Sequence, residues 1–151
     1  MKTTWILIAN ASEARLFQAE KVTKKILLID EFFHPASRKK IASLVTDVPG
    51  RYRKSTSTPL SSFEETFNPK QAEALRFARE LAEKLNLGRA TNRYTNLILV
   101  APPHFQGLLN KCCNHHVKNL ISNTLDKDYT KIREYDLPHY LNGKLSFRNA
   151  A

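Results

Sequence analysis

The stretch NPKQAEALRFARELAEKLNLGRATNRYTNLILVA, residues 68–101, decides the fold class because it joins a long amphipathic helix to a buried strand. Asn68 is a suitable N-cap, and Pro69 suits the first helical position. The apolar face recurs at helical spacing, in Leu75, Ala78, Leu81, Ala82 and Leu85. Gly88 is expected to end this helix.

The strand after the helix is predicted from its composition. Residues 96–101 read Asn-Leu-Ile-Leu-Val-Ala, a continuous apolar run that is typical of a strand buried on both faces. Because a helix precedes this strand, we expect it to have a parallel partner in the sheet.

The first third of the chain predicts three more strands, at residues 4–9, 14–20 and 25–33. They are rich in β-forming residues, and only short turn-like segments separate them. Short connections join antiparallel strands, so these three are expected to form a meander.

After residue 101, Pro102 and Pro103 break the strand. Residues 105–112 have the spacing of a short core-facing helix, and residues 117–122 are a candidate fifth strand. Residues 130–141 are a candidate last helix, interrupted near Pro138. We therefore expect residues 1–151 to be one α/β domain. Its mixed sheet would hold about five strands, an antiparallel meander of three plus parallel strands, with helices covering its faces.

Residues 34–67 have no sustained periodicity and predict a long basic loop. Residues 38–54 contain six basic residues and a single acidic residue, Asp47. Mobile basic residues with an aromatic neighbour suit phosphate contacts and base stacking. The candidate nucleic-acid-binding residues are therefore Arg38, Lys39, Lys40, Arg51, Tyr52, Arg53 and Lys54. The alternative is a solvated loop with no partner.

The charge of the whole chain agrees with a polyanionic partner. The sequence has 24 Lys and Arg against 14 Asp and Glu, for a formal net charge of +10. Such a field attracts nucleic acid, anionic lipid or an acidic protein, although it also serves solubility alone. There are only four glycines, which argues against a glycine-rich phosphate loop.

The cysteines and the hydropathy indicate a cytoplasmic protein. Cys112 and Cys113 are adjacent and predict no disulfide, which fits a reducing compartment. The apolar stretch at residues 5–9 is too short for the core of a signal peptide, and no run approaches the length of a membrane span.

No catalytic or metal-binding pattern stands out. Cys112, Cys113, His115 and His116 are adjacent pairs that diverge, whereas zinc ligands are spaced so that they converge. His104 follows a strand, where α/β ligand sites often form, but has no acidic neighbour in sequence. The carboxylates of a nuclease are not gathered by sequence either, since the candidates are Asp30, Glu31, Asp126 and Asp128. We expect no cofactor, no metal and no enzymatic activity.

Several segments, in order along the chain, resemble the bacterial family of proteins required for attachment to host cells. They are residues 5–10, 14–17, 43–51, 77–82, 97–109 and 126–130. The resemblance implies a non-enzymatic interaction protein. It extends to the central domain of archaeal and eukaryotic peptide-chain release factors and of Pelota, and so implies a release-factor-like or ribonuclease H-like architecture.

The resemblance to release factors lies in the helix, at residues 74–79. Their Gly-Gly-Gln tripeptide, which promotes peptidyl-tRNA hydrolysis, would fall here on Lys70, Gln71 and Ala72. The glycines supply backbone freedom that these residues lack. The resemblance therefore implies no release activity. The alternative to an attachment-type interaction protein is an RNA- or ribosome-associated binding module. The expected partners are RNA, the ribosome or an acidic protein.

Overall fold

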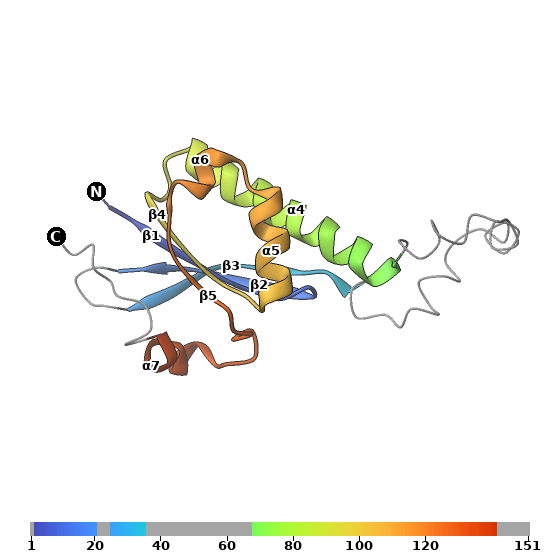
Figure 1. The fold of residues 1–151 in the computed structure, drawn as a ribbon. Helices are drawn as coiled ribbons and strands as arrows, with labels where there is room; N and C mark the ends of the chain where they lie inside the picture. The colour runs from blue at the N-terminus through green and yellow to red at the C-terminus, as the bar shows by residue number, and fades with distance from the viewer. Residues whose placement is uncertain (1, 21–24, 36–67, 142–151) are drawn as a thin grey trace, which may run out of the picture.

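The computed structural model describes residues 2–20, 25–35 and 68–141. They form a five-stranded sheet with helices on both faces (Figure 1). In chain order the elements are β1 (Thr4–Ala9), β2 (Glu13–Ala19), β3 (Ile26–Phe33), α4 (Pro69–Ala90), β4 (Asn96–Val100), α5 (Pro103–Cys112), α6 (His115–Lys118), β5 (Ile121–Leu125), the 3-10 helix η2 (Glu134–Asp136) and α7 (Leu137–Leu141).

The sheet is mixed, with the strand order β3-β2-β1-β4-β5. The hairpin partners β1–β2 and β2–β3 are antiparallel, whereas β1–β4 and β4–β5 are parallel. The α/β fold class, the antiparallel meander and the parallel partner expected for the strand after the long helix are all confirmed. The carboxyl ends of β1, β4 and β5 therefore meet at one edge of the sheet, called the carboxyl edge below.

The sheet is buried on both faces, which explains why β1 is apolar throughout. Trp5, Leu7 and Ala9 belong to the core under α4 and α5. Ile6 and Ile8, which alternate with them, belong to a second core on the opposite face. That second core is closed by Tyr129, Leu137 and Leu141 from the end of the described chain. Figure 1 shows α7 on the side of the sheet opposite α4.

The start of α4 follows from local capping. The Asn68 side-chain oxygen accepts hydrogen bonds from the backbone N–H groups of Lys70 at 2.9 Å and Gln71 at 3.2 Å. Pro69 is the first helical residue, where a missing N–H costs no helical bond. The predicted cap is confirmed.

The end of α4 differs from the prediction. The helix continues through Gly88 to Ala90, and the residue with left-handed backbone is Asn92, at φ 58°. Gly88 is instead the point at which α4 touches β1. A Cβ atom placed there would lie 2.5 Å from two ring carbons of Trp5. The prediction that Gly88 ends the helix is wrong because this glycine serves close packing.

The region around β5 also departs from the sequence prediction. A strand was expected at residues 117–122, but Val117 lies in α6 and the strand begins at Ile121. The Asn114 side-chain oxygen accepts a hydrogen bond from the Val117 N–H at 2.9 Å and so caps a short helix. Residues 117–122 have only three apolar side chains, at Val117, Leu120 and Ile121, a spacing that fits a helix as well as a strand, and here the cap decides.

The last predicted helix is shorter than expected. Only Leu137–Leu141 is α-helical, after one turn of 3-10 helix at Glu134–Asp136. Pro138 is the second residue of α7. A proline in the first turn of a helix does not interrupt it. Residues 128–132 are held by side-chain hydrogen bonds to the other end of the chain, which are described below.

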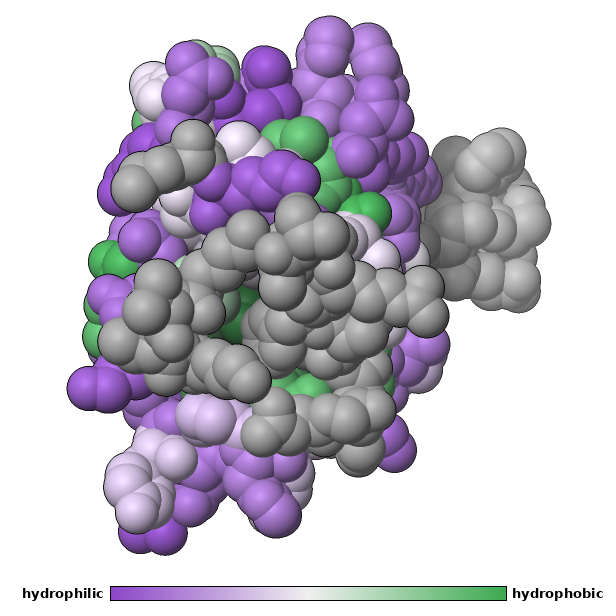
Figure 2. Space-filling view, turned by 90° about the vertical axis from the view of Figure 1, so that its left-hand side faces the viewer, coloured by the Kyte–Doolittle hydropathy of each residue, from purple (hydrophilic) through white to green (hydrophobic). Residues whose placement is uncertain are grey.

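On the face drawn in Figure 2, the visible surface of the described residues is mostly hydrophilic, with some hydrophobic patches. Within the described ranges, no helix is long and apolar enough to cross a membrane.

Candidate functional site

The predicted basic site lies outside the described residues. The structure describes the chain up to Pro35 and again from Asn68. The candidate residues all lie between these two positions: Arg38, Lys39, Lys40, Arg51, Tyr52, Arg53 and Lys54. The structure does describe the residues that flank this segment, and these define how it is attached to the fold.

The two flanks of the basic segment are joined through His34, which directly follows β3. Its backbone N–H donates to the Ser12 carbonyl oxygen at 2.8 Å, beside the β1–β2 turn. Its Nε2 lies 2.8 Å from Oε1 of Glu73, and its ring stacks on Phe77 with 5.3 Å between centroids. Both Glu73 and Phe77 belong to the first turns of α4. His34 thus fixes the end of β3 against the start of α4, near the carboxyl end of β1.

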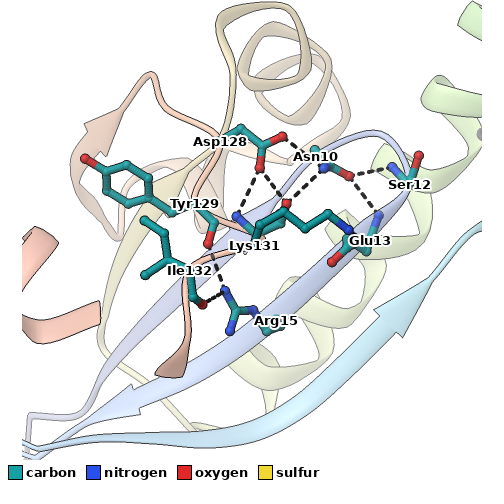
Figure 3. A network of polar contacts seen from close by, with 9 residues as sticks. Asn10, Ser12, Glu13, Arg15, Asp128, Tyr129, Lys131 and Ile132 are labelled. Carbon is teal, nitrogen blue, oxygen red and sulfur yellow. Dashed lines mark hydrogen bonds and ion pairs between the residues drawn. The ribbon is translucent and has the colours of Figure 1, made fainter. Parts of the chain in front are cut away.

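A polar network lies at the same carboxyl edge and centres on Asn10, the residue after β1 (Figure 3). Its Oδ1 accepts from the N–H groups of Ser12 at 2.8 Å and Glu13 at 2.9 Å, which shapes the β1–β2 turn. Its Nδ2 donates to Oδ2 of Asp128 and to Oγ1 of Thr130, each at 3.0 Å. One amide side chain therefore joins the turn to the segment after β5.

Asp128 is held as an anion in this network. Its Oδ1 accepts from the Thr130 N–H at 3.0 Å and from the Thr130 hydroxyl at 2.5 Å. Partial burial raises the pKa of Asp128, but hydrogen bonds from Thr130 and Asn10, together with the charge of Lys131, outweigh it and lower the pKa below 3.8. Such a carboxylate is a poor proton donor near neutral pH.

Two further contacts fasten the same segment. Lys131 Nζ lies 2.8 Å from Oε2 of Glu13; the Glu13 side chain is 11% exposed and the Lys131 side chain 76%. Arg15 Nη2 donates to the carbonyl oxygens of Tyr129 at 2.8 Å and Ile132 at 2.6 Å. Figure 3 shows Arg15 reaching from β2 to both carbonyls. The network thus locks residues 128–132 onto the β1–β2 hairpin, which favours a structural role over a catalytic one.

The acid stability of the protein should depend on Asp128. Because its folded pKa lies below its unfolded value, the carboxylate contributes fully above the unfolded pKa, and this contribution is lost as the pH falls towards the folded pKa. Between about pH 5 and about pH 3, wild type should therefore lose more free energy of unfolding than Asp128→Asn. Urea denaturation at a series of pH values measures the difference. Parallel profiles for the two proteins would contradict the assignment.

Gln106 is a buried polar residue that the sequence analysis did not single out. It is 6% exposed, and its Nε2 donates to the carbonyl oxygens of Leu99 and Leu125, each at 3.2 Å. It thereby ties the carboxyl ends of β4 and β5 together. His104, two residues earlier, is exposed at the start of α5. Gln106 lies in residues 97–109, one of the segments that resemble the family. Its contacts could not be predicted from the sequence, because only the fold brings the ends of β4 and β5 next to it.

The cysteines and histidines near α6 do not form a group. In the described ranges, no set of three or more His, Cys, Asp or Glu side chains is placed to hold a metal ion. The rings of His115 and His116 are tilted by 37° to each other, with 4.0 Å between centroids. Cys113 is buried in the core, and burial followed by the charge of Cys112 raises the pKa of the Cys113 thiol to about 11. Its environment is that of a core residue.

Comparison with solved structures gives matches at low sequence identity. A chain described as an archaeal protein has 10% identity and a TM-score of 0.51, with 94% of this chain and 34% of that chain covered. An archaeal translation termination factor has 9% identity and a TM-score of 0.48, covering 91% and 37%. The Ppx/GppA phosphatase of Aquifex aeolicus has 11% identity and a TM-score of 0.37, covering 83% and 36%. This chain thus spans about a third of each of these structures.

The sequence comparisons identify the family. None of the curated proteins matches this chain. The model of a family described as "protein required for attachment to host cells" matches residues 5–141, which include β1 and α7 and everything between them. The family resemblance expected from the sequence is thereby confirmed, and the chain belongs to the family of proteins required for attachment to host cells.

Proposed function

We propose that this chain acts as a non-catalytic binding protein for RNA, and that residues 38–54 make the contact. The observation that carries the proposal is the concentration of charge. Six basic residues and one acid give this segment a net charge of +5, half of the +10 of the whole chain. Basic side chains neutralise phosphates, and Tyr52 among them offers a face for base stacking.

The attachment of the segment supports this proposal. His34 and Asn68, which flank it, lie at the end of β3 and the start of α4, and the contacts of His34 with Glu73 and Phe77 join these elements. A charged segment with both ends held at one place on a rigid base loses less conformational freedom on binding than a free tail does. The fold therefore fixes the end of β3 and the start of α4, which flank the basic segment, against each other.

The catalytic alternative receives less support from the described residues. Two carboxylates beside the carboxyl edge, Glu13 and Asp128, are engaged by Lys131, Thr130 and Asn10, whereas Asp126, directly after β5, is exposed. The hydrogen bonds to Asp128 stabilise it as an anion, which does not suit proton donation. The network is better suited to keeping the base of the basic segment rigid.

The first test is co-sedimentation with ribosomes from lysate at low and moderate salt. Wild type should pellet with ribosomes at low salt, and the triple variant Arg51→Ala, Arg53→Ala, Lys54→Ala should stay in solution. The matched control is Lys84→Ala, Lys111→Ala, Lys118→Ala, which removes the same charge from exposed positions on α4, α5 and α6. This control should pellet as wild type does.

Binding to a single-stranded RNA oligonucleotide then gives the quantity that phosphate contacts predict. Three lost contacts should reduce the slope of log affinity against log salt by about 2. Fluorescence anisotropy of a labelled oligonucleotide measures this slope. If wild type does not bind, or if the loop triple variant binds like the control, the RNA proposal is wrong.

The second candidate is the attachment role that the family description states, and the match over residues 5–141 favours it. It requires the protein outside the cell, whereas RNA binding requires it inside. Digestion of intact cells with an added protease, followed by detection of the protein, separates the two. Loss of the protein from intact cells would support attachment, and its protection would support the intracellular role.

A further inference from the structure

β5 forms one edge of the sheet, and β3 forms the other. Among the described residues, no strand pairs with β5 on the side away from β4. In Figure 1 it passes in front of the other strands. An edge strand presents backbone N–H and C=O groups that another strand can bind, and natural proteins usually protect such edges with charges or prolines.

The two edges of this sheet differ in that protection. β3, the opposite edge strand, carries Asp30 and Glu31 in its middle. β5 has the sequence Ile-Ser-Asn-Thr-Leu, with no charge and no proline. Each edge strand has one irregularity in its register with its inner neighbour, so a bulge does not distinguish them. The charged residues distinguish the two edge strands. β5, which has none, is the edge strand that permits pairing.

The charges at the two ends of β5 indicate which strand it accepts. Lys118 precedes the strand, and the exposed run Asp126, Lys127 and Asp128 follows it with a net charge of −1. If two copies of β5 pair antiparallel, Lys118 of each copy comes near Asp126 of the other. A parallel pair would place like charges together. The edge is thus complementary to itself in the antiparallel sense, as a two-fold symmetric interface requires.

The strand itself also suits self-pairing. Ser122 and Thr124 have exposed side chains, and hydroxyl side chains form favourable cross-strand pairs. A chain with a net charge of +10 repels its copies, so an uncharged edge is the place where two copies can approach. We propose that β5 pairs with β5 of a second copy of this chain. The dimer then has one continuous sheet, with five strands from each copy. This inference is independent of RNA binding.

The test is the molar mass of the full chain in solution, measured by light scattering after size exclusion. Wild type should show twice 17.3 kDa, and the double variant Ser122→Lys, Thr124→Lys should show 17.3 kDa, because two like charges then oppose two others across the edge. The matched control, Gln71→Lys with Leu87→Lys, adds the same charge at exposed positions of α4 and should remain dimeric.

A second variant guards against loss of folding in the lysine variant. Asn123→Cys, at the centre of β5, should form a disulfide between two copies on mild oxidation, and mass spectrometry should identify a peptide that joins the two substituted positions. Wild type, with Cys112 and Cys113 alone, is the control. A monomeric wild type, or a dimer whose mass the lysine pair leaves unchanged and which gives no such peptide, overturns the proposal.

Discussion

Replacing Gly88 by alanine should destabilise the protein by about 2 kcal/mol, although the same change in an ordinary helix stabilises by about 1 kcal/mol. The new Cβ would lie 2.5 Å from Cη2 and Cζ3 of Trp5 and 3.2 Å from Cε1 of Tyr94. Trp5 is 2% exposed, and its ring stacks on that of Tyr94 with 4.5 Å between centroids. The indole has no free space to enter, so α4 must move away from β1.

Gly107→Ala is the matched control for this prediction. Gly107 lies within α5, and a Cβ added there meets no atom within 4 Å. The substitution should therefore stabilise the protein by about 0.5–1 kcal/mol through the lower conformational entropy of the unfolded chain. Urea denaturation of the three proteins gives both numbers. Equal effects of the two substitutions would show that contact with Trp5 does not decide the role of Gly88.

Replacing Arg15 by alanine should cost about 3 kcal/mol, because two hydrogen bonds from a charged donor are lost and the carbonyl of Tyr129 keeps only its bond from the Ile132 N–H at 3.2 Å. The two accepting carbonyls belong to Tyr129 and Ile132, and their segment closes the second core through Tyr129. Loss of the guanidinium should therefore loosen residues 128–141 before the rest of the fold. Hydrogen exchange should show faster exchange in this segment than in β1 and β4.

Arg133→Ala provides the comparison, since it removes the same side chain from the same region. Arg133 Nε lies 3.0 Å from Asp136 Oδ2, but the arginine side chain is 80% exposed, and such a pair contributes at most about 0.5 kcal/mol. Arg15→Lys should be intermediate, because one ammonium group does not reproduce the planar fork of a guanidinium. If Arg15→Ala is no more harmful than Arg133→Ala, the network does not hold the segment.

The proposals also have a joint consequence. The antiparallel arrangement of two β5 strands points the carboxyl edges of the two sheets in opposite directions. A dimer would thus carry its two basic segments at separate places. RNA long enough to reach both should bind more tightly than a short oligonucleotide, and this difference should be smaller for the monomeric lysine variant than for the dimeric control with the same added charge, Gln71→Lys with Leu87→Lys.

The elements set by local chemistry were predictable from the sequence. Asn68 and Pro69 define the start of α4, and the continuous apolar runs of β1 and β4 report strands buried on both faces. These signals lie within a few residues of the structure that they specify. The mixed sheet followed from them, since short connections require antiparallel strands and an intervening helix permits parallel ones. Family membership was likewise readable from ordered segments along the chain.

The features that only the tertiary structure decided depend on partners far apart in the chain. Asn10 and Asp128 are 118 positions apart, and no local pattern signals that they share a hydrogen bond. Gly88 looked like a helix end, because its role depends on Trp5 in a distant strand. Periodicity and capping depend on interactions between residues that are close in sequence. The polar network and the close contact at Gly88 exist only once packing has brought distant segments together, and packing depends on the shape of both partners.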